Sequence, residues 1–160
     1  MMDSQTLGVS MSRLIALLLF LALSTSAIAG AWGEGSFEND DALDWTGECS
    51  QSIGTKLVAT TLNAAVKARY LEAPEASAAV AAAEVVAAAR GKPSAKLPKQ
   101  LSAWLDRQSK AELASLASIA RQALRKVRDP KSSELKQLWS EGKKNGWDSN
   151  VGELEARLAN

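Results

Sequence analysis

The chain has 160 residues, of which 46% are hydrophobic, and its formal net charge is +1. This length suits a single domain, and a net charge so close to zero provides no broad basic field, so we do not expect a nucleic-acid partner. The chain contains no histidine, which excludes Ser-His-Asp and Cys-His catalytic machinery as well as zinc sites with histidine ligands.

Residues 1–29 have the pattern of a secretory signal peptide. Arg13 supplies the positive charge, residues 14–23 form an unbroken apolar run, and residues 27–29 (Ala-Ile-Ala) form a small-x-small cleavage site. We therefore predict cleavage before Gly30 and export of the protein to the periplasm or the medium, with no stable membrane span left after cleavage.

The sequence leaves two alternatives for this segment, one for its cleavage and one for the start of translation. The alternative to cleavage is an anchor over residues 14–31, but the apolar run of ten residues is short for a membrane-spanning helix, which needs about 20. Translation starts either at Met1 or at Met11, and the second start leaves a cleaner basic segment before the apolar run.

We predict that residues 30–160 form one domain with an uneven distribution of charge. Residues 30–48 contain six acids and no base, whereas residues 90–131 contain eleven bases and three acids. Charge runs of this kind usually form solvated faces. They also suit contact with a protein partner.

The first residues of this domain are rich in glycine and aromatic side chains. Gly30, Gly33 and Gly35 give the backbone a high conformational entropy, so the segment takes one shape only if something fixes it. The rings of Trp32 and Phe37 carry large apolar areas, and we expect both to be buried as anchors of this loop.

Polar residues then mark the start of a helix, which we predict over residues 40–48. Asn39 or Asp40 caps this helix through a side-chain oxygen, and Asp41 lies in its first turn, near the positive end of the helix dipole.

Helical periodicity without any strand-like alternation predicts an all-α fold, a compact bundle of about six helices. After the first helix, apolar spacing, caps and prolines predict the others over about residues 55–71, 74–90, a short stretch from Pro98, 110–128, a stretch from Pro130 with Asp129 as its cap, and a last one from about Asn150.

Several side chains are predicted to lie in the core. Leu116 and Leu124 belong to the apolar stripe of the predicted helix 110–128. Trp45 is one of five tryptophans, most of which we expect to be packed in the core. Cys49 is the only cysteine, and we expect a buried small hydrophobe there rather than a partner in an intermolecular disulfide.

The predicted helix 74–90 is unusually rich in alanine, which makes up nine of the 14 residues 76–89. Alanine costs least in a helix, and its small side chain lets neighbouring helices approach. We therefore predict that this helix is central and that the glycine-rich loop docks on it. Glu84 is the only charged residue in its apolar part, so we expect it to accept hydrogen bonds from the loop's backbone N–H groups.

The opening GAWGEGSFENDDALDW, residues 30–45, resembles the beginning of a mainly bacterial family called domain of unknown function 4259. Weaker similarities to the same family lie at residues 70–73, 82–88 and 134–139. The resemblance covers the chain from residue 30 onward, whereas the segment before it departs from the family pattern. It implies a compact helical domain and brings no established activity, substrate or catalytic residue.

Two classes of function follow from these observations. The first is an exported, non-catalytic helical module that binds another protein, for instance an immunity-like protein that neutralises a toxin, which is an analogy with other small families. The second is a carboxylate-dependent hydrolase that uses Glu84 with the acidic opening segment. Those acids also offer oxygen ligands for Ca²⁺ or Mg²⁺, but their spacing does not match an EF-hand loop. We predict the first class, with neither a metal nor a cofactor.

Overall fold

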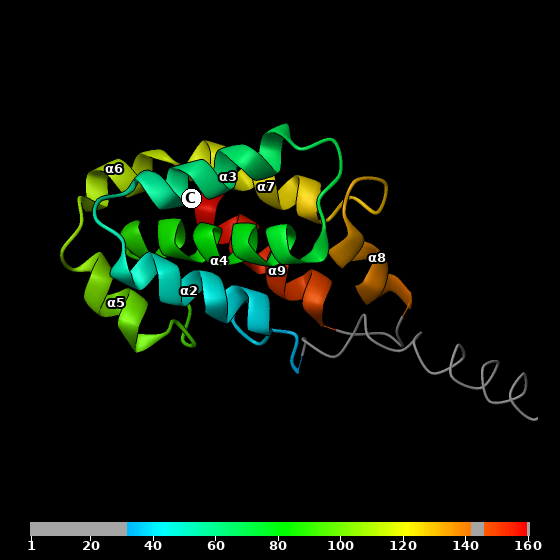
Figure 1. Cartoon of the computed structure of the whole chain (residues 1–160), viewed down its shortest axis with the longest axis horizontal. Helices are drawn as coiled ribbons and strands as arrows, with labels where there is room; N and C mark the ends of the chain where they lie inside the picture. Colours follow the sequence, from blue (N-terminus) through cyan, green and yellow to red (C-terminus); the bar gives the residue numbers. More distant parts are fainter. Residues whose placement is uncertain (1–31, 142–145, 160) are drawn as a thin grey trace, which may run out of the picture.

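The computed structural model describes residues 32–141 and 146–159, coloured by sequence in Figure 1. The predicted signal peptide and Gly30 lie outside the described residues. The described part of the chain is all-α, as the sequence predicts, and no helix in it combines the length and apolar character needed to cross a membrane.

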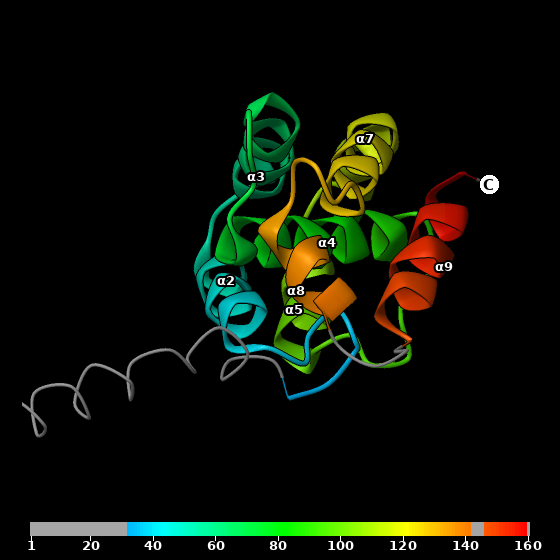
Figure 2. The same ribbon diagram turned by 90° about the vertical axis from the view of Figure 1, so that its right-hand side faces the viewer.

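The helices surround one central member. In chain order they are α2 (Asp40–Gln51), α3 (Lys56–Lys67), α4 (Ala73–Ala89), α5 (Lys99–Leu105), α6 (Lys110–Ser115), α7 (Ala117–Val127), α8 (Glu134–Glu141) and α9 (Trp147–Ala159). α4 crosses the middle of the molecule, with α3 and α7 above it in Figure 2 and with α2 and α9 to its two sides. The predicted central position of the alanine-rich helix is therefore confirmed.

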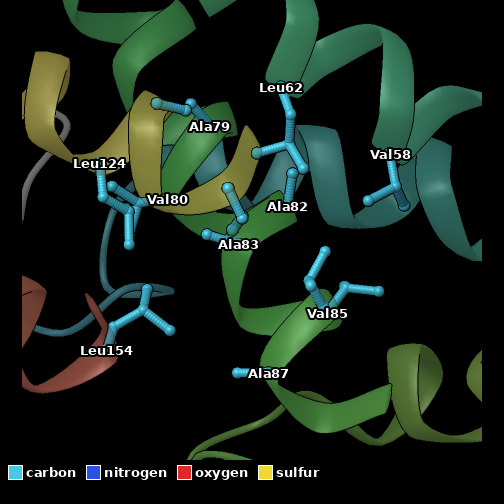
Figure 3. Close-up of a cluster of buried hydrophobic side chains, with 14 of the residues drawn as sticks. Val58, Leu62, Ala79, Val80, Ala82, Ala83, Val85, Ala87, Leu124 and Leu154 are labelled. Carbon is cyan, nitrogen blue, oxygen red and sulfur yellow. The ribbon is translucent and has the colours of Figure 1, made fainter. Parts of the chain in front are cut away.

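The composition of α4 explains this position. Residues 79–88 are all buried, as expected for a helix without a polar face. Figure 3 shows how Leu62 of α3, Leu124 of α7 and Leu154 of α9 converge on the small side chains of α4. The helix begins with a capping box between Glu72 and Glu75, and it ends before Gly91, whose φ of 80° suits a residue without a Cβ.

Two helix boundaries differ from the sequence prediction because distant backbone segments pair. α3 ends at Lys67 instead of continuing to Leu71, and α8 begins at Glu134 instead of Pro130. The Leu71 N–H donates to the Ser132 carbonyl at 2.8 Å, and the Glu134 N–H donates to the Leu71 carbonyl at 2.9 Å. These bonds hold both segments extended, and local sequence patterns do not reveal a pairing across about 60 residues.

The predicted helix 110–128 is divided at Leu116 into α6 and α7. The Leu116 N–H donates to the Leu113 carbonyl, three residues earlier, at 3.0 Å, which tightens the turn in the manner of a 3₁₀-helix. Leu124 is fully buried, as predicted, whereas Leu116 is only partly buried and packs against the core, so its prediction is confirmed only in part. α9 begins at Trp147, three residues before the predicted start.

The other predicted core residues are found as expected. The buried Trp45 donates its ring N–H to the Thr61 hydroxyl at 2.9 Å, and the fully buried Trp104 donates to the Ser52 carbonyl at 2.9 Å. Cys49 is buried, and this burial raises the pKa of its thiol to about 12. A thiol that stays protonated at neutral pH is a poor nucleophile, in agreement with a packing role.

Candidate functional site

The opening loop, residues 32–39, is organised around Glu38. The N–H groups of Trp32 and Gly33 donate to the Glu38 carbonyl at 3.1 and 3.2 Å, and the Gly35 N–H donates to the Glu38 carboxylate at 2.9 Å. The expectation that Glu84 accepts these backbone N–H groups is therefore wrong. An acceptor inside the loop itself satisfies the donors that burial would otherwise leave unpaired.

The carboxylate of Glu38 also explains why glycines occupy this loop. A Cβ atom added at Gly33 would overlap the Glu38 side chain, and one added at Gly35 would lie 3.0 Å from its carboxyl group. Neither glycine has a positive φ. The loop therefore needs these glycines for the close approach of a side chain, and not for a left-handed backbone.

Trp32 and Phe37 lie in opposite environments. Phe37 is 6% exposed and belongs to the core, as predicted, but Trp32 is 61% exposed. The prediction that Trp32 anchors the loop by burial is therefore wrong, because the loop's own hydrogen bonds fix its shape without this ring. The Trp32 ring N–H instead donates to the Asp40 carboxylate at 3.3 Å.

α2 begins as the sequence predicts. The Asn39 side chain accepts the Ala42 N–H at 2.8 Å, so Asn39 is the cap, and Asp40 and Asp41 lie in the first turn. Partial burial, together with the neighbouring carboxylates of Asp44 and Asp40, raises the pKa of Asp41.

Glu84 is 2% exposed and connects the opening loop, α4 and α9. Its Oε1 atom accepts the Ser36 hydroxyl at 2.8 Å, and Arg157 Nη2 donates to Oε1 and Oε2 at 2.8 and 2.9 Å. Arg157 Nη1 also donates to the Lys92 carbonyl at 2.9 Å. The loop thus docks on the central helix through Glu84, as predicted, although a hydroxyl group and not the backbone makes the contact.

A pocket of about 290 Å³ lies beside this cluster. The opening loop, α4, residues 93–96 and α9 form its walls, with the buried Phe37 and Glu84 among the lining residues. Asp40 and Asp41 are not among them. This pocket therefore lacks the arrangement that the hydrolase hypothesis requires, in which Glu84 and these first-turn acids of α2 line one pocket.

Lys96 on the pocket rim forms an ion pair with Glu38. The hydrogen bond from Lys96 and the one from the Gly35 N–H hold the pKa of Glu38 below its ordinary value. Within residues 32–141 and 146–159, no three side chains of the types His, Cys, Asp and Glu lie close enough to hold a metal ion.

Three residues of this cluster escape prediction from the sequence. Ser36 and Glu38 lie in the recognised opening, but nothing local separates Glu38 from its five acidic neighbours or marks the hydroxyl of Ser36 as the docking group. Arg157 follows Glu84 by 73 residues. The apolar surroundings of Glu84 indicate that it needs a donor, but they do not identify which of the chain's 19 bases supplies it.

The helices and the docked loop define an all-α domain with a polar cluster between its first and last elements. The sequence model of the family described as Domain of unknown function (DUF4259) matches residues 30–150. The chain belongs to this family, which confirms the resemblance seen in the opening residues. No curated protein and no solved structure shows a significant match to it.

Proposed function

We propose that this chain is an exported helical domain that binds a protein partner and has no catalytic role. The observation that carries the proposal is the 61% exposure of Trp32 on a loop whose shape is fixed by Glu38. A rigidly held, exposed tryptophan loses little entropy on binding and brings a large apolar area, and such residues are frequent energetic centres of protein interfaces.

The surface next to Trp32 defines the chemistry of the partner. Asp40, Asp44 and Glu48 are exposed at i, i+4 and i+8 of α2, so they follow one face of the helix. Leu43, 39% exposed, lies on the same side. A partner with basic side chains around an apolar contact complements this surface in charge and in polarity.

The contacts of Glu84 favour this function over hydrolysis. Both of its carboxylate oxygens accept hydrogen bonds from Arg157, and one also accepts the Ser36 hydroxyl. Both oxygens of this carboxylate are engaged in contacts between elements of the fold, and such contacts are what a structural ion pair needs, whereas a general acid or base has to reach the proton that it transfers.

Affinity capture with matched variants tests the proposal. The mature protein is used to capture partners from the exported fraction of its host, in parallel with Trp32→Ala and with Tyr70→Ala, which removes another exposed aromatic ring. We expect a partner that the original chain and Tyr70→Ala retain and that Trp32→Ala loses. Equal capture by all three proteins contradicts the proposed surface.

The export part of the proposal rests on the signal pattern of residues 1–29. N-terminal sequencing of the protein from the periplasm or the medium is expected to begin at Gly30. Recovery of an intact start at Met1 or Met11 from a soluble cytoplasmic fraction contradicts export.

A further inference from the structure

The pocket beside Glu84 contains one unpaired charge. Four of its lining residues are charged, and the two bases among them are already paired, Lys96 with Glu38 and Arg157 with Glu84. The side chain of Glu153, which is exposed on α9, forms no hydrogen bond or ion pair with the described part of the chain. The unpaired carboxylate of Glu153 therefore favours a positively charged ligand in this pocket.

Two further lining residues, Asn150 and Glu84, have oxygen atoms that can accept another hydrogen bond. Asn150 donates its side-chain N–H to the Glu34 carbonyl at 3.1 Å, which leaves its amide oxygen available. Among the residues that the structure describes, the Oε2 atom of Glu84 accepts only from Arg157, and a carboxylate oxygen accommodates a second donor. Together with Glu153, the pocket offers three oxygen acceptors, contributed by α4 and α9.

The rest of the pocket is suited to a short aliphatic chain. Phe37 is buried below, while Pro93 and Ala95 are exposed at the rim. The volume of about 290 Å³ lies at the lower limit for small-molecule sites, about 300–1,000 Å³, so the pocket accommodates a single side chain more readily than a large ligand.

We propose that this pocket binds the side chain of a lysine carried by the protein partner, an inference that rests on the proposed binding function. A lysine ammonium group has three donors and no acceptor, which matches the three acceptors of the pocket. Its aliphatic stem covers apolar surface while the charge stays with polar groups. The basic partner inferred from the face of α2 supplies such a residue.

Chemical-shift titration of the purified, ¹⁵N-labelled protein tests this site. The probes are Nα-acetyl-lysine methylamide, the same compound with an acetylated side chain, its arginine analogue, and n-butylammonium. We expect the lysine probe to shift the amides of Gly35, Ala95 and Glu153, and to bind about tenfold more tightly than the acetylated probe, which lacks the charge. Equal binding of these two probes, or shifts at other sites, overturns the proposal.

The remaining probes distinguish a lysine side chain from an arginine side chain and from a free amine. Tighter binding of the arginine analogue contradicts the choice of lysine. Binding of n-butylammonium as tight as that of the lysine probe indicates a site for free amines and contradicts the partner's side chain as the ligand.

A pair of variants identifies the residue responsible. Glu153→Gln removes the unpaired charge from an exposed position, so the fold is retained, and it is expected to weaken binding of the lysine probe about tenfold. Glu141→Gln removes an exposed acid at the end of α8 that does not line the pocket and is expected to leave the affinity unchanged. Unchanged affinity in Glu153→Gln overturns the proposal.

The outcome is separable from that of the proposed function. If no lysine-dependent shifts occur while partner capture still depends on Trp32, the pocket proposal fails and the binding function stands. If capture does not depend on Trp32 but Glu153-dependent binding of the lysine probe is observed, the pocket is supported and the α2 surface is not.

Discussion

Small residues are concentrated both in α4 and in the opening loop, but for different physical reasons. In α4 the alanines bring the neighbouring helices close, and apart from those of Glu84 the contacts of residues 79–88 are apolar. In the loop, Gly33 and Gly35 make room for the Glu38 side chain, whose carboxylate accepts the Gly35 N–H. One region therefore depends on the volume of its side chains, and the other depends on the position of a few polar atoms. Substitutions distinguish the two.

The largest effect is expected in the apolar region. Leu124→Ala removes a fully buried side chain that faces α4 and is expected to lower the free energy of unfolding by about 2–5 kcal/mol, from lost burial and the cavity that remains. Leu116→Ala, at a partly buried position, is the matched control with a smaller loss. Denaturant melts measure both, and equal losses contradict the difference in burial between the two leucines.

The ion pair between α9 and α4 is expected to have the next largest effect. Arg157→Ala leaves the carboxylate of Glu84, whose side chain is 3% exposed, without its cation, and we expect a loss of about 3 kcal/mol, as for other buried pairs that lose one partner. Arg125→Ala breaks a pair with Glu155 in which the arginine is half exposed, for which less than about 1 kcal/mol is expected. Similar losses in the two variants contradict a special role for Arg157.

A pair of glycine variants tests whether the loop needs glycine for the close approach of Glu38. Gly33→Ala forces the Glu38 side chain away from the loop and is expected to destabilise the protein by about 1–3 kcal/mol, as overpacking does elsewhere. A Cβ at Gly47 in α2 meets no other atom within 4 Å, so Gly47→Ala is expected to stabilise the helix by about 0.5–1 kcal/mol. Thermal melts in which both substitutions have the same sign contradict the close approach of Glu38.

The smallest effect concerns pH. Because the pKa of Glu38 is held below its ordinary value of 4.5 by Lys96 and the Gly35 N–H, its contribution to the loop is present above that value and is lost as the pH falls through the lowered pKa. We expect the Gly35 amide resonance to titrate below pH 4.5 and to lose this dependence in Glu38→Gln. A titration midpoint at or above the ordinary value contradicts the contact.

The sequence predicts the apolar region more fully than the polar one. Periodicity and composition identify α4 as central and place Leu124 in the core, because burial of apolar area depends on residue type and spacing. The same reasoning predicts that Trp32 is buried, which is wrong, since its surroundings depend on hydrogen bonds that the loop makes with itself.

The polar cluster illustrates the limit of such reasoning. The isolated charge of Glu84 correctly predicts that the opening loop docks at this position. The donors are Ser36 and Arg157, which lie 48 residues before it and 73 residues after it. Local patterns contain no information on contacts at that separation, so the sequence indicates the need for partners and the fold decides which they are.

The central claim is that the opening loop is held on α4 by the contact between Ser36 and Glu84. Amide hydrogen exchange of Ser36→Ala tests it most directly, because the substitution removes one hydroxyl and leaves the charge pair intact. We predict faster exchange at residues 33–38, since the loop opens locally without global unfolding, and unchanged exchange in α4. Unchanged exchange at residues 33–38 would contradict the claim.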